Sequence, residues 1–256
     1  ELSPDGEDTV PLSRSASIAS LGGDPAPFLT GFAGALPNIP VLEKAAAGIG
    51  MLVPTQDRDN IVRRVPALMR IGENVQPTLA LELLRVATGE RTYAIRSDDA
   101  GISAVSIAGN SIPTDRQGRV WVYYAPEHRD TLYVSAADVL AGNAELGGKL
   151  VLVGTSAVGL RDLVATPLRA AMPGVEVHAQ ILETVLSGAR LERPSYALGA
   201  ELVAIAAVGL AIVLLVPAIG AWWTLAVGTA LMAGLVAGAR HMFVHEELLL
   251  DISWPL

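Results

Sequence analysis

The segment Ala197–Val216 reads ALGAELVAIAAVGLAIVLLV, and after a short Pro-Ala-Ile-Gly turn Ala221–Ala239 reads AWWTLAVGTALMAGLVAGA. The first segment carries a single charge, Glu201, near its start, and the second carries none. Twenty helical residues rise about 30 Å, the thickness of the hydrocarbon layer of a membrane. Trp222 and Trp223 lie at one end of the second segment, where an aromatic belt is expected. These features predict two transmembrane helices; a pair of helices buried in a soluble protein is the alternative.

The chain beyond these segments indicates a third span. Leu248–Leu256 is another apolar run, with Asp251 and Trp254 near its boundary, and we interpret it as the start of a third transmembrane helix. The turn between the first two spans has no positive charge, so the positive-inside rule says little there. The loop after Ala239 is acidic, which is tolerated outside. We therefore expect the residues before Ala197 to be extracytoplasmic.

Small residues in the second span suggest self-association. Gly234 and Gly238 match the GxxxG pattern, which lets two helix backbones approach closely. The pattern is common in glycine-rich spans, so the alternative is that it reflects a high glycine content and not a helix contact. We nevertheless expect a homodimer.

The residues before Ala197 have the composition of a water-soluble domain. The formal net charge of the chain is −8, which argues against nucleic-acid binding because phosphates require a basic partner surface. Cysteine is absent, which excludes disulfides and Cys-ligated metals. There is no P-loop or dinucleotide fingerprint, and we expect no cofactor and no metal. Residues 1–38, rich in Ser, Gly, Pro and Asp, are predicted to be a flexible loop.

Residues 39–194 are predicted to form an α/β domain with a mixed sheet and flanking helices. The expected helices are Val41–Ala47, Pro77–Thr88, Ala136–Leu140 and Gly174–Leu186, and the expected strands are Ile49–Val53, Ile61–Ile71, Tyr93–Ile95, Ile102–Ile107, Val120–Tyr124 and Lys149–Val153. The first two strands are expected to form a hairpin. Lys149–Val153 is the strongest strand, because a Leu-Val-Leu-Val run between glycines is typical of a central parallel strand buried on both faces.

The loop after Lys149–Val153 is the expected ligand site, because ligands of open α/β sheets bind beyond the carboxyl ends of the strands. The candidate residues are Gly154, Thr155, Ser156, Asp162, Thr166, Glu176 and His178. Gly154 allows a close backbone approach, the hydroxyls and Asp162 offer polar contacts, and the helix from Gly174 can direct N–H groups at an anion. The alternative is that Asp162, Thr166 and Glu176 only tie down a long loop, and that His178 is a satisfied polar residue of the packing.

Two other chemistries are weaker. Gly154-Thr-Ser156-Ala-Val158 approaches the nucleophile elbow G-x-S-x-G but has valine in place of its second glycine. An anchored extracytoplasmic hydrolase is therefore the alternative function. His241 and His245 have the i, i+4 spacing of a metal-binding pair if this stretch is helical, and a wetted loop at the membrane surface is the other interpretation.

Short matches in a fixed order connect the chain to a known family. They lie at Asp57–Pro66, Ser135–Gly142, Leu146–Ala157, Gly159–Asp162, Thr166–Pro167 and Pro173–Ala179. These stretches resemble the CHASE type-two family of extracellular sensory domains, and the resemblance covers Ile39–Leu256. The chain departs from the family at both ends, where the preceding anchor helix, the first part of the sensory domain and the end of the third span are not found.

Members of that family precede adenylate or guanylate cyclases, histidine kinases and serine/threonine kinases in bacterial receptors, and three transmembrane helices usually follow the domain. The resemblance implies a non-catalytic sensor in the bacterial cytoplasmic membrane. Its expected partners are an unknown small-molecule or surface cue outside the cell and an output domain in the same chain inside it. No cyclase or kinase sequence is present in these residues.

Overall fold

The fold is described from a computed structural model, which describes residues 2–3, 17–52, 56–125, 132–155, 162–194 and 196–250. The chain divides into two compact units, Glu1–Ala189 and Arg190–Leu256. The boundary between them lies just before the first apolar helix, where the sequence changes from water-soluble to membrane-like composition. Each unit is therefore considered by itself.

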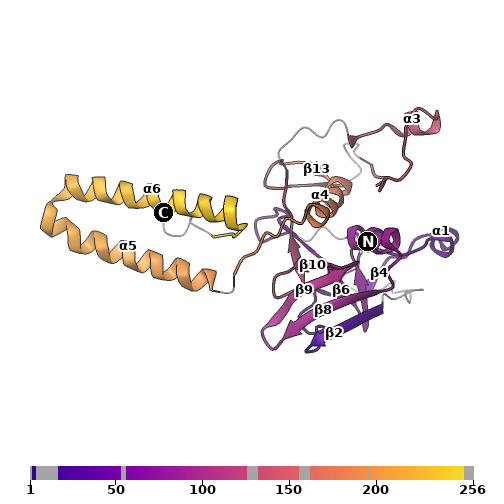
Figure 1. Ribbon diagram of the computed structural model, residues 1–256, viewed down its shortest axis with the longest axis horizontal. Coiled ribbons are helices and arrows are strands. Elements are labelled where there is room, and N and C mark those ends of the chain that lie inside the picture. The colour runs from indigo at the N-terminus through magenta and orange to yellow at the C-terminus, as the bar shows by residue number, and fades with distance from the viewer. Residues whose placement is uncertain are drawn as a thin grey trace. The chain divides into compact units, whose positions relative to one another are not determined.

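The first unit is built on a four-stranded mixed sheet in the order β10-β9-β8-β2 (Figure 1). Its strands are β2 (Ser17–Gly22), β8 (Thr92–Asp98), β9 (Gly101–Ile107) and β10 (Asn110–Pro113). β8, β9 and β10 are antiparallel neighbours, whereas β2 runs parallel to β8. The side chains of β8 alternate between buried and exposed, since successive residues of a strand face opposite sides of the sheet. The predicted α/β fold with a mixed sheet is confirmed.

The prediction that residues 1–38 form a flexible loop is wrong for Ser17–Gly22. These residues pair with β8 over the whole length of β2. β2 is an edge strand and is mostly exposed, and its serines and glycine resemble the composition of a loop. Only Ile18 packs against the core.

Smaller sheets complete the first unit: β3-β6-β7, β11-β5, β12-β13 and β1-β4. Their strands are β1 (Leu2–Ser3), β3 (Gly31–Phe32), β4 (Gly34–Ala35), β5 (Arg64–Pro66), β6 (Leu68–Ile71), β7 (Asn74–Pro77), β11 (Arg119–Trp121), β12 (Leu163–Val164) and β13 (Met172–Pro173). The predicted hairpin of Ile49–Val53 with Ile61–Ile71 is wrong. β6 pairs with β7 instead, because the tight turn at Gly72 places two adjacent segments together, and Met51 makes only an isolated bridge to Thr78.

Four helices belong to this unit: α1 (Pro40–Ala45), α2 (Leu79–Thr88), α3 (Ala136–Leu140) and α4 (Gly174–Ser187). α2 and α4 pack against each other. Gly89 and Gly188 end these two helices in the left-handed conformation that glycine adopts without strain. The Ser135 side chain caps α3 by accepting the Ala137 N–H at 3.2 Å. The main core lies between α2, α4 and the four-stranded sheet, and includes Leu68, Leu81, Tyr93, Ile95, Val105 and Ile181.

The prediction that Lys149–Val153 is a central buried strand is wrong. No strand includes these residues in the structure, and Leu150, Val151 and Val153 are exposed, Val153 to 92%. A β-strand is stabilised by hydrogen bonds to a neighbouring strand, and no described residue provides that neighbour. Apolar, β-branched composition alone therefore did not decide the conformation of this run.

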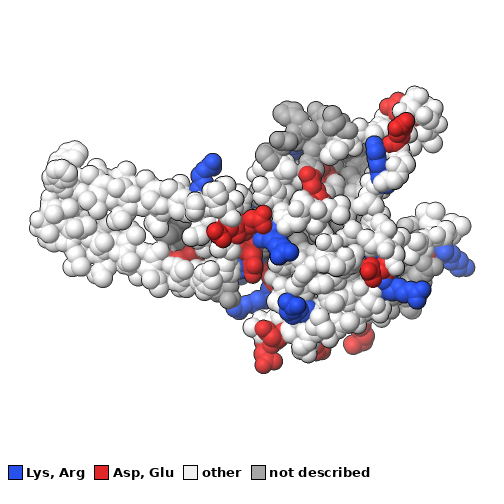
Figure 2. All heavy atoms as spheres, viewed as in Figure 1, with Lys and Arg blue, Asp and Glu red and all other residues white. Residues whose placement is uncertain are grey.

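The second unit consists of two long helices, α5 (Ala197–Ile219) and α6 (Ala221–Glu246), which pack side by side. Gly220 joins them with a backbone φ of 79°. Both helices are long and apolar enough to cross a membrane, and nearly all of their side chains are exposed, unlike those of helices in a soluble core. Figure 2 shows an uncharged surface along most of the hairpin. The prediction of a third span rests mainly on residues 251–256, which lie outside the described residues.

Candidate functional site

The candidate site is organised by α4, whose position is fixed by both apolar and polar contacts. Val177, Ile181 and Val185 recur at helical spacing and are buried in the core. On another face, the Thr184 hydroxyl accepts the Tyr123 N–H at 3.0 Å, and the Gln180 side-chain oxygen accepts the Ala125 N–H at 3.3 Å. These two hydrogen bonds attach α4 to the segment that follows β11.

The first turn of α4 is held by the loop that the sequence singled out. The Asp162 carbonyl accepts the Gly174 N–H at 2.8 Å. A Cβ atom at position 174 would collide with the Asp162 carboxylate, and one at position 154 would lie 2.5 Å from Cβ of Val175. Close packing against Val175 therefore requires glycine at position 154, whereas a side chain at position 174 would displace the Asp162 carboxylate. Gly154 and Asp162, which are distant in sequence from α4, meet at its beginning.

Thr166 and Glu176 are linked through Arg169. The Thr166 hydroxyl accepts the Arg169 N–H at 3.1 Å and donates to the Arg169 carbonyl at 3.2 Å, which closes a tight turn. The Arg169 guanidinium then lies 3.5 Å from a carboxylate oxygen of Glu176. Glu176 is buried while Arg169 is half exposed, so this ion pair connects the site to solvent.

His178 lies buried in the second turn of α4, where 6% of its surface is exposed. Burial lowers the pKa of its imidazole to about 4, because the charged form loses its hydration. Its Nδ1 atom has no hydrogen-bond partner among the described residues. The neutral imidazole, whose Nδ1 has no partner among the described residues, can form a hydrogen bond with a small polar ligand.

The structure therefore brings four of the candidate residues to the first turn of α4: Gly154 and Asp162 directly, and Thr166 and Glu176 through Arg169. His178 lies two positions after Glu176 and therefore faces a different side of the helix. Thr155 is exposed beside Gly154, and Ser156 lies outside the described residues. Two carboxylates, those of Asp162 and Glu176, stand at the helix N-terminus, and the Gly174 N–H is already used. Carboxylates here offset the positive end of the helix dipole. The arrangement favours a neutral polar or cationic ligand over the anion that was expected.

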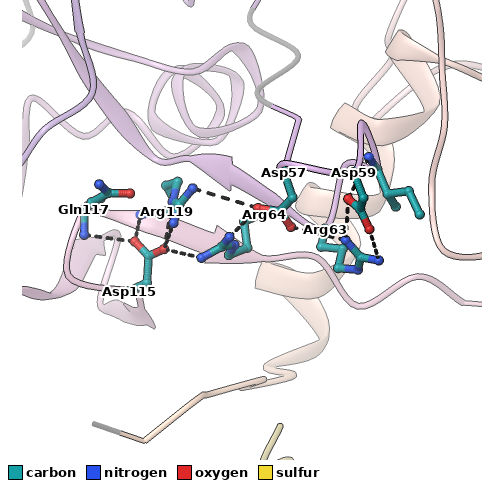
Figure 3. A network of polar contacts seen from close by, with 8 residues as sticks. Asp57, Asp59, Arg63, Arg64, Asp115, Gln117 and Arg119 are labelled. Carbon is teal, nitrogen blue, oxygen red and sulfur yellow. Dashed lines mark hydrogen bonds and ion pairs between the residues drawn. The ribbon is translucent and has the colours of Figure 1, made fainter. Parts of the chain in front are cut away.

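A separate network of charges joins β5 to β11 (Figure 3). Asp57 lies between Arg64 and Arg119, and Asp115 pairs with Arg64 at 3.1 Å and with Arg119 at 2.7 Å. Arg63 pairs with Asp59 at 2.8 Å, and hydrogen bonding to Arg63 lowers the pKa of Asp59 to about 2. The carboxylates and guanidiniums of this network are equal in number, so their charges cancel. This balance indicates a structural network rather than a ligand site.

The network also stabilises a segment that is hydrogen-bonded to the loop of the candidate site. It holds the turn before Val62, whose N–H donates to the Ala165 carbonyl at 2.8 Å, next to Thr166. The sequence singled out the stretch Asp57–Pro66, which contains Arg63 and Arg64, but not Asp115 and Arg119. The available signal was a turn in the Asp-Arg-Gln-Gly-Arg segment, where the Asp115 side chain accepts the Gln117 and Arg119 N–H groups.

A second functional feature lies in the unit Arg190–Leu256, where the segment before α5 meets the segment after α6. The Glu192 N–H donates to the Glu247 carbonyl at 3.1 Å, and the Leu249 N–H donates to the Glu192 carbonyl at 2.9 Å. The Arg190 N–H donates to the Glu247 carboxylate at 2.7 Å. We call the paired segments Arg190–Arg193 and Glu247–Leu249 the junction.

An ion pair fixes the beginning of α5 beside the junction. Arg193 donates to both carboxylate oxygens of Glu201, at 2.7 and 3.0 Å, and Glu201 is buried. A carboxylate within an apolar span is costly unless it is paired. Glu201, which the sequence marked as the one charge of its span, therefore serves to tie the helix to the segment that enters it.

The sequence profile of the CHASE2 domain matches residues 10–216, which is most of the chain. The chain belongs to the CHASE2 domain family. No curated protein and no solved structure matches it.

The CHASE2 match begins at residue 10, earlier than the resemblance followed from Ile39, and so includes β2. It ends at residue 216, within α5. CHASE2 is an extracellular sensory domain and not a catalytic one. The family match therefore gives the first unit a sensory role. Ser156, the serine of the hydrolase alternative, lies outside the described residues.

Proposed function

We propose that this chain is the signal-sensing and transmembrane-transmission region of a bacterial receptor in the cytoplasmic membrane. In this proposal the CHASE2 domain lies outside the cytoplasm, and an output domain in the same protein, an adenylate or guanylate cyclase or a protein kinase, lies inside. The observation that carries the proposal is the direct connection of a sensory domain to two helices long and apolar enough to span the membrane.

The proposed cue binds at the start of α4. The Glu176–Arg169 pair and the loop around Asp162 offer charged and polar groups at the first turn of α4. Nδ1 of His178, which has no hydrogen-bond partner among the described residues, adds a polar atom on another face of the same helix. A small polar or cationic molecule, or a group on a surface, fits this chemistry. A cue acts by binding one of two conformations of the domain more tightly than the other.

The proposed transmission runs from α4 to the junction. α4 ends at Ser187, and only a short segment separates it from Arg190. The junction hydrogen-bonds this incoming segment to the residues that leave α6. A displacement of Arg190–Arg193 therefore reaches Glu247–Leu249 without having to pass along either apolar helix. A second copy of the chain, packed through Gly234 and Gly238, is the proposed partner in the membrane; both glycines are exposed on α6.

Site-directed cysteine labelling tests the membrane arrangement, and these 256 residues contain no native cysteine that would react. Glu90→Cys lies on the exposed surface of the domain, and Ala218→Cys lies exposed in the last turn of α5, next to the Gly220 link to α6. In intact cells producing the whole protein, a membrane-impermeant maleimide should label position 90 and not position 218. Position 218 should become reactive after lysis.

The matched control is the buried position Ala80→Cys, which should stay unlabelled in both conditions until the protein is denatured. Labelling of position 218 together with protection of position 90 in intact cells would reverse the orientation and remove the proposed function. Labelling of both positions in intact cells would show that α5 and α6 do not span the membrane.

A further inference from the structure

His241 and His245 lie near the end of α6, where the structure is helical through Glu246. The interpretation of this stretch as a wetted loop is therefore wrong. Residues four apart on a helix lie on the same face, one turn from each other. Both side chains are exposed, and their ring centroids are 4.5 Å apart with the rings tilted by 47°.

This separation suits a shared metal ion. A zinc ion bound about 2.1 Å from one nitrogen of each ring, in tetrahedral geometry, places the two ring centroids about 5 Å apart. The spacing is that of the two histidines of H-E-x-x-H helices, which hold zinc on one helix face. Little side-chain movement is required, because both rings already point to the same side.

The surroundings also favour a cation. The last turns of a helix carry the negative end of its dipole, and Glu246 and Glu247 follow directly. Arg240 is the nearest basic residue in sequence and the only one in α6. The described residues contain no group of three or more His, Asp or Glu side chains placed to hold a metal. Among the described residues the two histidines are therefore the ligands in place, and water would complete the coordination of an ion.

We propose that His241 and His245 form a binding site for a divalent transition-metal ion, of the zinc or copper class, at the end of α6. Imidazole ligands suit zinc, copper and nickel and not magnesium or calcium. His245 lies two residues before Glu247. The site is therefore at the end of α6 that the junction pairs with the segment before α5. A bound ion cross-links the last two turns of α6. It thereby rigidifies the end of α6 that leads into the junction.

Zinc binding to the whole chain in detergent micelles or nanodiscs tests the proposal. The protein is purified without a histidine tag and titrated with zinc chloride by calorimetry. One saturable ion per chain is expected, and magnesium should not compete. Loss of an outer-shell partner alone lowers metal affinity about 10- to 100-fold, so His241→Ala or His245→Ala should weaken zinc binding by about tenfold or more.

A spacing variant is the sharpest control. The double change Phe243→His with His245→Phe keeps two histidines in the same turn but separates them by two positions, on different helix faces. It should bind zinc as weakly as the single variants, whereas His128→Gln, which removes a histidine outside the pair, should bind like the wild type. Zinc binding by the spacing variant with wild-type affinity would overturn the proposal, as would failure of the wild type to bind.

Discussion

Acidification should loosen α4 through His178. Its pKa is lowered from 6.5 to about 4 by burial, so the folded domain resists protonation at a pH where the unfolded chain accepts it. The unfolded state then binds more protons than the native state, and stability falls as the pH falls. The loss begins below about pH 6.5 and levels off below about pH 4.

The size of this effect follows from the two pKa values. Between pH 7.5 and pH 5.0 the unfolded histidine becomes almost fully charged, while the buried one remains mostly neutral. The resulting loss of opening free energy is about 2 kcal/mol, since a pKa difference of one unit corresponds to about 1.4 kcal/mol. At pH 7.5 the contribution is close to zero.

Hydrogen exchange by mass spectrometry measures this loss in nanodiscs, in peptides that cover Val177–Val185, after correction for the intrinsic exchange rate at each pH. The wild type should lose about 2 kcal/mol more opening free energy on acidification than His178→Gln, which cannot titrate. Val177→Ala is the matched control, because it removes a buried side chain of the same helix and should lower stability equally at both pH values.

Equal losses in the wild type and in His178→Gln would refute the reasoning. Imidazole NMR of the wild type provides the same test without a variant that must fold. A midpoint near pH 6.5 for the His178 resonance would show that burial does not lower its pKa, and the linkage would then disappear.

Three further outcomes follow from other contacts. Gly174→Ala should destabilise the domain by about 1–3 kcal/mol in thermal unfolding, because its Cβ meets the Asp162 carboxylate, whereas Gly147→Ala, with open space around it, should not. Glu192→Cys combined with Leu248→Cys should form a disulfide under mild oxidation, since these residues are bridge partners; no cross-link by gel shift would contradict the junction. Gly234→Ile should abolish chemical cross-linking of two chains in the membrane, and a variant that still cross-links fully would exclude this face as the dimer contact.

The helices could be predicted from the sequence with little error. α2, α4, α5 and α6 begin or end within a few residues of the predicted positions, apart from the longer C-terminal end of α6. Helical hydrogen bonds join residues four apart, so the information that decides a helix is local, and Gly89 and Gly188 mark its end in the same stretch. The family could be recognised for a similar reason, since its matches are short and ordered.

The strand pairings and the site depended on the tertiary structure. Ser17–Gly22 became a strand because β8 offers it a partner, while Lys149–Val153, with the stronger strand composition, has none among the described residues. A strand is completed by hydrogen bonds to residues far along the chain, and a sequence pattern does not identify them.

In the candidate site, too, the sequence predicted the residues and the tertiary structure decided their contacts. The sequence singled out the polar residues of the loop after Gly154, but it did not place Asp162 against Gly174 or Arg169 against Glu176. It also marked Glu201 without its partner Arg193. The ion pairs and the burial of His178 form only when distant segments pack together. Pairing and burial depend on which residues are neighbours in space, and composition does not determine this.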